Sequence, residues 1–255
     1  YNIITSNKSI FHSTLIFDSR PNNKKKKLDL VQHFYGLEIK FDKKVFHKDE
    51  MTLMDFQESN HGVHFFYVLP FSATSALVET TYFSSNIFNE QKYKSDLTQY
   101  INKNFRKSDY KVAYTEKGII PMFPIKNNLD HNKYFKIGTP GNWVKLSTGY
   151  GFQNSFENAK NIVDKIIIKK KPIIERNHLL FLLDLTFLEF LKKYSRSSDS
   201  FFQCLFFKNN YKTIVNFLIG KPTLFDLIKI IISLPKIRLI KCLYRVLVEK
   251  KYYVR

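Results

Sequence analysis

One acidic residue stands out by its surroundings. Glu79 lies in SALVETTYF, residues 75–83, where nearly all of the remaining residues are apolar, aromatic or β-branched. If this segment is a strand, side-chain alternation places Glu79 on one face with Leu77, Thr81 and Phe83. A buried, unpaired carboxyl group has a raised pKa and keeps its proton near neutral pH, as a general acid must. The alternative is an exposed edge-strand glutamate, or one paired with a lysine, and composition alone favours it.

A glycine-rich segment is the second feature that could do chemistry. GTPGNWVKLSTGYGF, residues 138–152, has glycines at 138, 141, 149 and 151, where the backbone can approach a ligand closely. A helix that begins near Thr148, capped by Ser147 or Thr148, would offer free N–H groups to a phosphate or a flavin ring edge. The spacing is not that of a Walker A loop, and such turns are also frequent in loops that bind nothing.

Other catalytic and metal-binding patterns are missing from the sequence. No Ser–His–Asp, Cys–His or H-E-x-x-H arrangement stands out, and the seven histidines are scattered, which favours structural roles. Cys204 and Cys242 lie far apart without metal-ligand spacing, so we expect no metal site and no disulfide, and a cytoplasmic location is the default.

The chain is strongly basic, with 41 Lys and Arg against 22 Asp and Glu and a formal charge of +19. Such a charge suits nucleic acid or an anionic membrane surface. However, the abundant Lys, Asn, Ile, Phe and Tyr all have A/T-rich codons, so genome composition explains much of the balance, and no nucleic-acid-binding motif is present. No run reaches the roughly 18 apolar residues of a membrane span.

The elements that must position Glu79 form an α+β pattern. Alternating or β-rich segments predict strands over residues 12–18, 30–41, 63–70 and 75–83, and two of these look like neighbouring strands of one antiparallel sheet. Helical spacing over residues 89–105 predicts a helix that crosses back over this sheet. A strand over residues 134–143 runs into the glycine turn, and the helix after it carries Phe156, Ala159, Val163 and Ile166 on one stripe.

From Asn177 onward the sequence is helical, with Pro222 and Pro235 between segments. We therefore divide the chain into an α/β region, residues 1–154, and a helical region, residues 155–255. The last helix sets Ile237, Ile240, Leu243 and Leu247 against Lys236, Arg238, Lys241 and Arg245. This pattern suits a membrane interface, and an ordinary surface helix packed on the core is the alternative.

Seven short strings occur in an order typical of one enzyme family. They are FDSRP (17–21), QHFYGLEI (32–39), TLMDF (52–56), FYVLPFS (66–72), ALVETTYFS (76–84), GIIPM (118–122) and STGYGF (147–152). In this order they resemble the lycopene β-cyclase family, from about Thr14 to Asn154 and more faintly through the helical tail. The resemblance implies a flavoprotein of the glutathione-reductase-like superfamily, whose substrate domain has an antiparallel sheet.

The resemblance also implies a cofactor, a substrate and a set of site residues. The cofactor would be reduced FAD, with NAD(P)H as reductant, and the substrate would be lycopene reached at the membrane surface, with the enzyme peripherally associated. Glu79 matches the family's acid–base glutamate. The implied FAD-binding residues are Asp18, Ser19, Arg20, Gly138, Pro140, Gly141, Ser147, Thr148, Gly149 and Tyr150. The implied substrate-binding residues are Phe66, Phe83, Pro121 and Met122.

Two departures from the family pattern affect these expectations. The family usually has a second acid directly after the glutamate, where this chain has Thr80, so a carboxylate pair is not expected there. No G-x-G-x-x-G fingerprint follows a first strand, and the chain begins without Met, so it reads as a fragment that lacks the dinucleotide-binding half. A flavin monooxygenase of the same superfamily and a basic nucleic-acid-binding module remain as alternatives. The ring type and the oligomeric state stay open.

Overall fold

A five-stranded antiparallel sheet is the largest element of the computed structural model, which describes residues 2–21, 30–105, 109–125, 134–170 and 177–248. The chain divides into two compact units, each made of separate stretches. Unit 1 comprises residues 1–26, 123–188 and 204–255, and unit 2 comprises residues 27–122 and 189–203. Neither unit begins or ends at residue 154, where the sequence analysis divides the chain.

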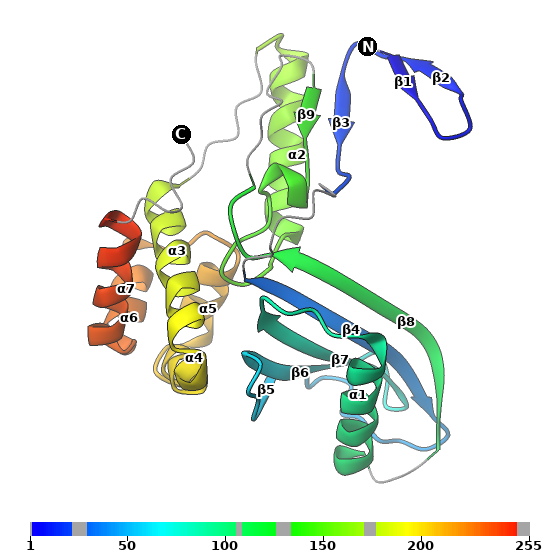
Figure 1. Ribbon diagram of the computed structural model, residues 1–255, viewed down its shortest axis with the longest axis vertical. Helices are drawn as coiled ribbons and strands as arrows, with labels where there is room; N and C mark the ends of the chain where they lie inside the picture. Colours follow the sequence, from blue (N-terminus) through cyan, green and yellow to red (C-terminus); the bar gives the residue numbers. More distant parts are fainter. Residues whose placement is uncertain (1, 22–29, 106–108, 126–133, 171–176, 249–255) are drawn as a thin grey trace. The chain divides into compact units, whose positions relative to one another are not determined.

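Unit 2 contains the sheet, with strand order β5-β6-β7-β4-β8 (Figure 1). The strands are β4 (Val31–Phe41), β5 (Thr52–Gln57), β6 (Val63–Pro70), β7 (Ser75–Ser84) and β8 (Tyr110–Pro121). The predicted strands over 30–41, 63–70 and 75–83 are confirmed, as is the prediction that two strands of the set are antiparallel neighbours, and β7 pairs with both of the others. Strands β5 and β8 were not predicted from the sequence. Because β7 is the middle strand, Glu79 does not lie on an edge.

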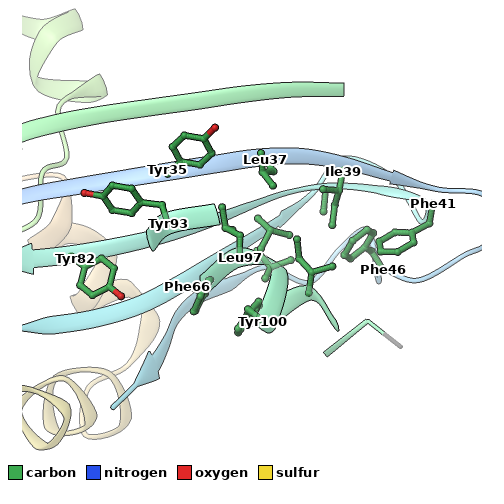
Figure 2. Packing of buried hydrophobic residues seen from close by; sticks show 14 residues of the cluster. Tyr35, Leu37, Ile39, Phe41, Phe46, Phe66, Tyr82, Tyr93, Leu97 and Tyr100 are labelled. Carbon is green, nitrogen blue, oxygen red and sulfur yellow. The ribbon is translucent and has the colours of Figure 1, made fainter. Parts of the chain in front are cut away.

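Helix α1 (Glu90–Asn104) covers one face of this sheet, as predicted (Figure 1). Asn89 caps its start, because the Asn89 side chain accepts a hydrogen bond from the Lys92 N–H. Tyr93, Leu97, Tyr100 and Ile101 recur at helical spacing and are buried against the sheet. Figure 2 shows this core, in which the side chains of β4 and β6 meet those of the helix.

The pairing of β4 with β8 contains a bulge. Glu38 lies opposite Tyr114, but the next residue, Ile39, lies opposite Val112, so β8 has one extra residue, Ala113. From Glu38 to Val31 the register is regular and ends with Val31 opposite Pro121. The bulge therefore sets which β8 side chains share a face with those of β4.

Unit 1 begins with short strands. β1 (Asn2–Ile4) pairs with β2 (Ile10–His12), and β3 (Ile16–Asp18) pairs in parallel with β9 (Tyr134–Lys136). The predicted strand over 12–18 is only partly right, since Ser13 and Leu15 form a turn in which the Ser13 hydroxyl donates to the Leu15 carbonyl. The strand over 134–143 is confirmed in its first part, and it runs into the 3₁₀ turn Thr139–Gly141 as expected.

The helix after the glycine turn, α2, begins later than predicted. It spans Phe152–Ile167 and follows Gly151, which provides no capping side chain. The prediction that Ser147 or Thr148 caps it is wrong, because the Ser147 hydroxyl instead donates to Asp184 at 2.6 Å. Its predicted apolar stripe does form, but Phe156 and Val163 are 64% and 53% exposed.

The predicted helical C-terminal region is confirmed. It contains α3 (His178–Lys193), the 3₁₀ turn Ser195–Ser197, α4 (Ser198–Phe207), α5 (Tyr211–Leu218), α6 (Leu224–Ser233) and α7 (Lys236–Val248). On α7, Ile237, Ile240 and Leu247 are exposed, whereas Cys242 and Val246 are buried. Ile237, Ile240 and Leu247 of the predicted apolar stripe are therefore exposed, whereas Leu243 is half-buried. Within the described ranges, no helix has the length and apolarity that crossing a membrane requires.

Candidate functional site

Glu79 is buried at the centre of the sheet. It lies opposite Tyr67 on β6 and Gly36 on β4, and it is 8% exposed. Its carboxylate accepts a 2.6 Å hydrogen bond from the Thr81 hydroxyl. The alternative interpretation, an exposed or edge-strand glutamate, is wrong, and within the described residues Glu79 has no ion pair with a lysine. The predicted face shared by Leu77, Glu79, Thr81 and Phe83 agrees with the strand register.

The surroundings of Glu79 favour its protonated form. Burial raises the pKa of this carboxyl from 4.5 to about 7, against the opposing effect of the Thr81 hydroxyl. Glu116 raises the pKa further, both by its charge and by a hydrogen bond between the two side chains. A carboxyl group with this pKa can act as an acid or a base near neutral pH.

Aromatic side chains line the same face beside Glu79. Tyr67 is its direct neighbour on β6, and burial raises the pKa of the Tyr67 hydroxyl, which therefore stays neutral. Phe65 packs edge-on against both Tyr67 and Phe83, each at 5.1 Å between ring centroids. Phe56 extends the row from β5. Ring faces stabilise nearby positive charge, so this face suits an apolar or cationic ligand.

The opposite face of the sheet holds a separate polar network. Thr80 hydrogen-bonds His64 at 2.9 Å, and His33 contacts the hydroxyls of Ser84 and Tyr93 at 3.1 and 2.6 Å. Burial lowers the pKa of His33 and of His64 from 6.5 to about 4, so both are neutral at pH 7. Any side chain at position 80 faces this network and not Glu79.

A cavity of about 570 Å³ lies on this helix-covered face and includes polar groups from β5, β6 and α1. Phe66, predicted to bind substrate, lines it and stacks on Tyr100 at 3.9 Å. Phe66 is therefore not brought together with Glu79. Phe83 does share the Glu79 face and is 3% exposed.

Pro121 and Met122, also predicted to bind substrate, lie at the end of β8. Pro121 is the last residue of the strand, opposite Val31. The Met122 side chain is fully buried, and its N–H donates to the Leu30 carbonyl. A contact of either residue with substrate stays a prediction.

Asp18 forms the centre of a polar cluster in unit 1. Its carboxylate accepts hydrogen bonds from the Arg20 guanidinium at 2.9 and 3.0 Å, from Lys136 at 2.7 Å and from the Tyr134 hydroxyl. Arg20 and the other donors hold the pKa of Asp18 well below its usual range. The cluster joins β3 to β9. Ser19, which lies between Asp18 and Arg20 in the sequence, is exposed. Their predicted contact with a flavin remains a prediction.

The glycine turn follows β9 directly. Gly141 is required sterically, because a Cβ there would lie 2.5 Å from the Lys136 carbonyl oxygen. Pro140 is buried beside it. Gly138 has φ +61° with no atom within 4 Å of a Cβ position, so its backbone has open space above it. This open backbone is the part of the turn that a ligand could approach.

A second turn leads from this loop to α2. Gly149, with φ +71°, and Thr148 both donate to the Lys145 carbonyl, and the Lys145 N–H donates back to Tyr150. A buried ion pair of 2.5 Å between Lys145 and Asp184 anchors the turn. This segment leads directly into α2. Among the described residues, no side chain caps the start of that helix.

One residue of the site, Glu116 on β8, was not predicted from the sequence. Its carboxyl group contacts that of Glu79, although 37 positions separate the two residues in sequence. The alternation of Glu116, Gly118 and Ile120 was the available signal, but the pairing of β8 with β4 was needed to interpret it. Among the described residues, no group of three or more His, Cys, Asp or Glu side chains could hold a metal ion.

Solved structures with a related fold include a geranylgeranyl bacteriochlorophyll reductase-like protein from Thermoplasma acidophilum. It has a TM-score of 0.53 and 13% identity, over 84% of this chain and 54% of that protein. A myxobacterial chondrochloren halogenase, described as FAD-dependent, has a TM-score of 0.41 and 11% identity, over 96% of this chain and 64% of that protein. This chain thus spans little more than half the length of the first of these proteins.

Sequence comparisons give a family. No curated protein matches the chain. The family model described as "Lycopene cyclase protein" matches residues 2–243, which include Glu79, Glu116 and both turns before α2. The chain therefore belongs to the lycopene cyclase family.

Proposed function

We propose that the protein cyclises the end groups of lycopene to β-ionone rings in a redox-neutral reaction, with Glu79 as the general acid. One observation carries the proposal: the carboxyl group of Glu79 is buried on the central strand of the sheet, with a pKa of about 7. Membership of the lycopene cyclase family supplies the substrate class.

The proposed reaction needs a proton donor and a dry surface. The Glu79 O–H bond breaks as its proton adds to the terminal alkene, which leaves a tertiary carbocation. An internal double bond then attacks this carbon, and loss of a ring proton completes an isomerisation with no net redox change. The rings of Phe65 and Tyr67 lie on the same face, where they can stabilise positive charge without offering a strong nucleophile.

We further propose that the protein holds FAD. Two features fit this cofactor: the open backbone above Gly138, and the uncapped first turn of α2 after Gly151, whose N–H groups suit a phosphate or the flavin ring edge. Reduced FAD would supply electron density that stabilises positive charge near the substrate, and NAD(P)H would keep it reduced.

Access to a lipid-dissolved substrate is the third part of the proposal. On α7, exposed Ile237, Ile240 and Leu247 lie near exposed Lys236 and Lys241, as in helices that rest on anionic membranes. Lys236→Glu with Lys241→Glu should reduce binding to phosphatidylserine vesicles more than binding to neutral vesicles in a sedimentation assay. Equal binding of the variant and the wild type would reject a membrane role for α7.

The main test is expression of the full-length protein in lycopene-accumulating bacteria, followed by chromatography of the pigments. We expect cyclic carotenes from the wild type, and from Glu50→Gln, which makes the same change at an exposed position. Glu79→Gln should lower product by about 10²–10⁴-fold, the usual contribution of a general acid. Its flavin absorbance should stay unchanged.

Two outcomes would contradict the proposal. Full activity of Glu79→Gln would reject Glu79 as the acid. Oxygenated pigments with NADPH-dependent oxygen uptake, from a flavin-loaded protein, would indicate a monooxygenase of the same superfamily.

A further inference from the structure

We infer that Glu116 and Glu79 form a carboxyl pair that shares one proton, and that this pair both donates the proton of the cyclisation and recovers it. The inference rests on the proposed function for its chemistry, whereas the pair itself rests on the sheet. Glu79 lies on β7 and Glu116 on β8, and both lie opposite the same residue of β4, Gly36. In a regular antiparallel sheet, side chains in one such row point to the same face.

Gly36 makes the contact possible. Strands lie about 4.8 Å apart, so the Cα atoms of Glu79 and Glu116 are separated by roughly 10 Å and their side chains must reach over β4. A Cβ at position 36 would lie 2.9 Å from Glu116 Cγ and 3.2 Å from Glu116 Oε1. The Glu116 side chain therefore occupies the space that any larger residue at position 36 would fill.

A hydrogen bond between two carboxyl groups requires one proton between them, and a buried carboxylate in contact with a half-buried one resists simultaneous ionisation. Glu116 opposes the ionisation of Glu79 in this way, since both its charge and its hydrogen bond raise the pKa of Glu79. Thr81 and Tyr67 are the other polar groups that face Glu79 from β7 and β6, and both stay neutral at pH 7. The singly protonated pair is thus the resting form near neutrality.

In each turnover the pair gives up one proton and regains one proton. The Glu79 O–H bond breaks as the C–H bond of the substrate forms, and the pair is then doubly ionised beside the carbocation. When the ring C–H bond breaks, its proton forms an O–H bond in the pair, which regains its single proton. No oxidant, reductant or external base enters this sequence.

The first test follows the titration of Glu79 directly. Glutamate labelled with ¹³C at the carboxyl carbon reports each side chain by NMR, and Glu79→Gln identifies the signal of Glu79. We expect this signal to titrate near pH 7 in the wild type and in Glu50→Gln. In Glu116→Gln its midpoint should fall by about 1 pH unit, because a like charge and a shared proton are removed. An unchanged midpoint in a folded Glu116→Gln variant would overturn the pair.

Gly36→Ala provides a second variant that keeps both carboxyl groups. The added methyl group displaces the Glu116 side chain, so the midpoint of Glu79 should again fall although no acid has been removed. A rise of the midpoint, or no change, in a folded Gly36→Ala variant would also reject the pair.

Activity separates this inference from the proposed function. A general acid must be protonated, so the cyclisation rate falls at alkaline pH. In Glu116→Gln the alkaline limb of the pH–rate profile should move to lower pH by as much as the NMR midpoint of Glu79 does. At a fixed alkaline pH, the rate should then be about tenfold lower for each pH unit of this shift. A limb that stays in place would show that Glu116 has only a structural role. If the wild type makes no cyclic product while the NMR coupling is present, the proposed function fails and the pair stands.

Discussion

The two faces of the five-stranded sheet bury ionisable groups in opposite ways. The face covered by α1 contains His33 and His64, both with hydroxyl partners and both neutral at pH 7, since burial lowers each pKa to about 4. The other face contains Glu79, whose pKa is raised to about 7, and Glu116 beside it. At neutral pH the two histidines on one face are thus fully neutral, whereas Glu79 on the other face is partly ionised.

This difference gives the faces opposite contributions to stability as pH changes. A histidine with a lowered pKa stabilises the fold above pH 6.5, and this contribution is lost as the pH falls through about 4. A glutamate with a raised pKa does the reverse, because the unfolded chain ionises at pH 4.5 and the folded chain only near pH 7. Ionisation of the buried Glu79 therefore lowers the free energy of unfolding as the pH rises. Such a cost is typical of a functional site.

Acid denaturation should give the largest effect. Between pH 7 and pH 4.5 the two histidines together should lower the free energy of unfolding by about 4 kcal/mol, at about 2 kcal/mol each after allowance for solvent screening. Protonation of Glu79 raises the free energy of unfolding over the same range, equally in the wild type and in a histidine variant, so the difference between the two proteins measures the histidines. Urea denaturation at both pH values measures this. The double variant His33→Gln and His64→Gln should lose much less over this range. An equal loss in the variant would show that other groups control acid stability.

A matched pair of leucines compares the packing of the two faces. Leu97→Ala empties a fully buried position between α1 and the sheet and should lower the free energy of unfolding by about 3 kcal/mol. Leu77→Ala changes a half-buried position on the Glu79 face and should cost about 1 kcal/mol. Chemical denaturation of both variants decides this. Equal losses would mean that the Glu79 face is packed as tightly as the helix-covered face.

Glu79→Gln should stabilise the protein while it removes activity. At pH 8 the wild type has an ionised, buried carboxylate, so the neutral amide should raise the free energy of unfolding by about 2 kcal/mol. At pH 4 the two proteins should be equally stable, which serves as the internal control. A variant that is less stable at both pH values would contradict the opposite pH dependence of the two faces.

The smallest effects should come from two adjacent threonines. Thr80→Val removes the hydroxyl partner of His64 and should cost about 1 kcal/mol of stability, without shifting the titration of Glu79. Thr81→Val removes the hydroxyl that favours ionised Glu79, so the pKa of Glu79 should rise above 7. Denaturation and carboxyl NMR separate these results. A shift of Glu79 in Thr80→Val would mean that the faces are coupled.

Local patterns in the sequence predicted most of the sheet and its helix. Tyr93, Leu97 and Tyr100 recur at helical spacing, and the alternation along β7 predicted the face on which Glu79 lies. Both signals depend only on neighbouring residues. Tyr110–Glu116 was missed because its side chains are mostly exposed, so it lacks the apolar alternation of a half-buried strand.

Long-range contacts set the features that the sequence did not predict. Ser147 has the residue type of a helix cap, but Asp184, 37 positions away, takes its hydroxyl. In the same way, Thr80 indicated that Glu79 had no acidic neighbour, whereas the neighbour comes from β8. Adjacent residues on a strand face opposite ways, so a second acid at position 80 could not have paired with Glu79 on this sheet.

The bulge at Ala113 has a consequence for how the length of this chain can vary. A one-residue insertion or deletion between Ala113 and Glu116 that shifted Glu116 against β4 would move Glu116 to the other face of β8 and separate the two acids, even though every residue type was kept. A change on the far side of the bulge would leave them facing each other. Length variation in this strand should therefore be tolerated in active relatives only between Tyr110 and Ala113, so the position of a gap is itself informative about the site.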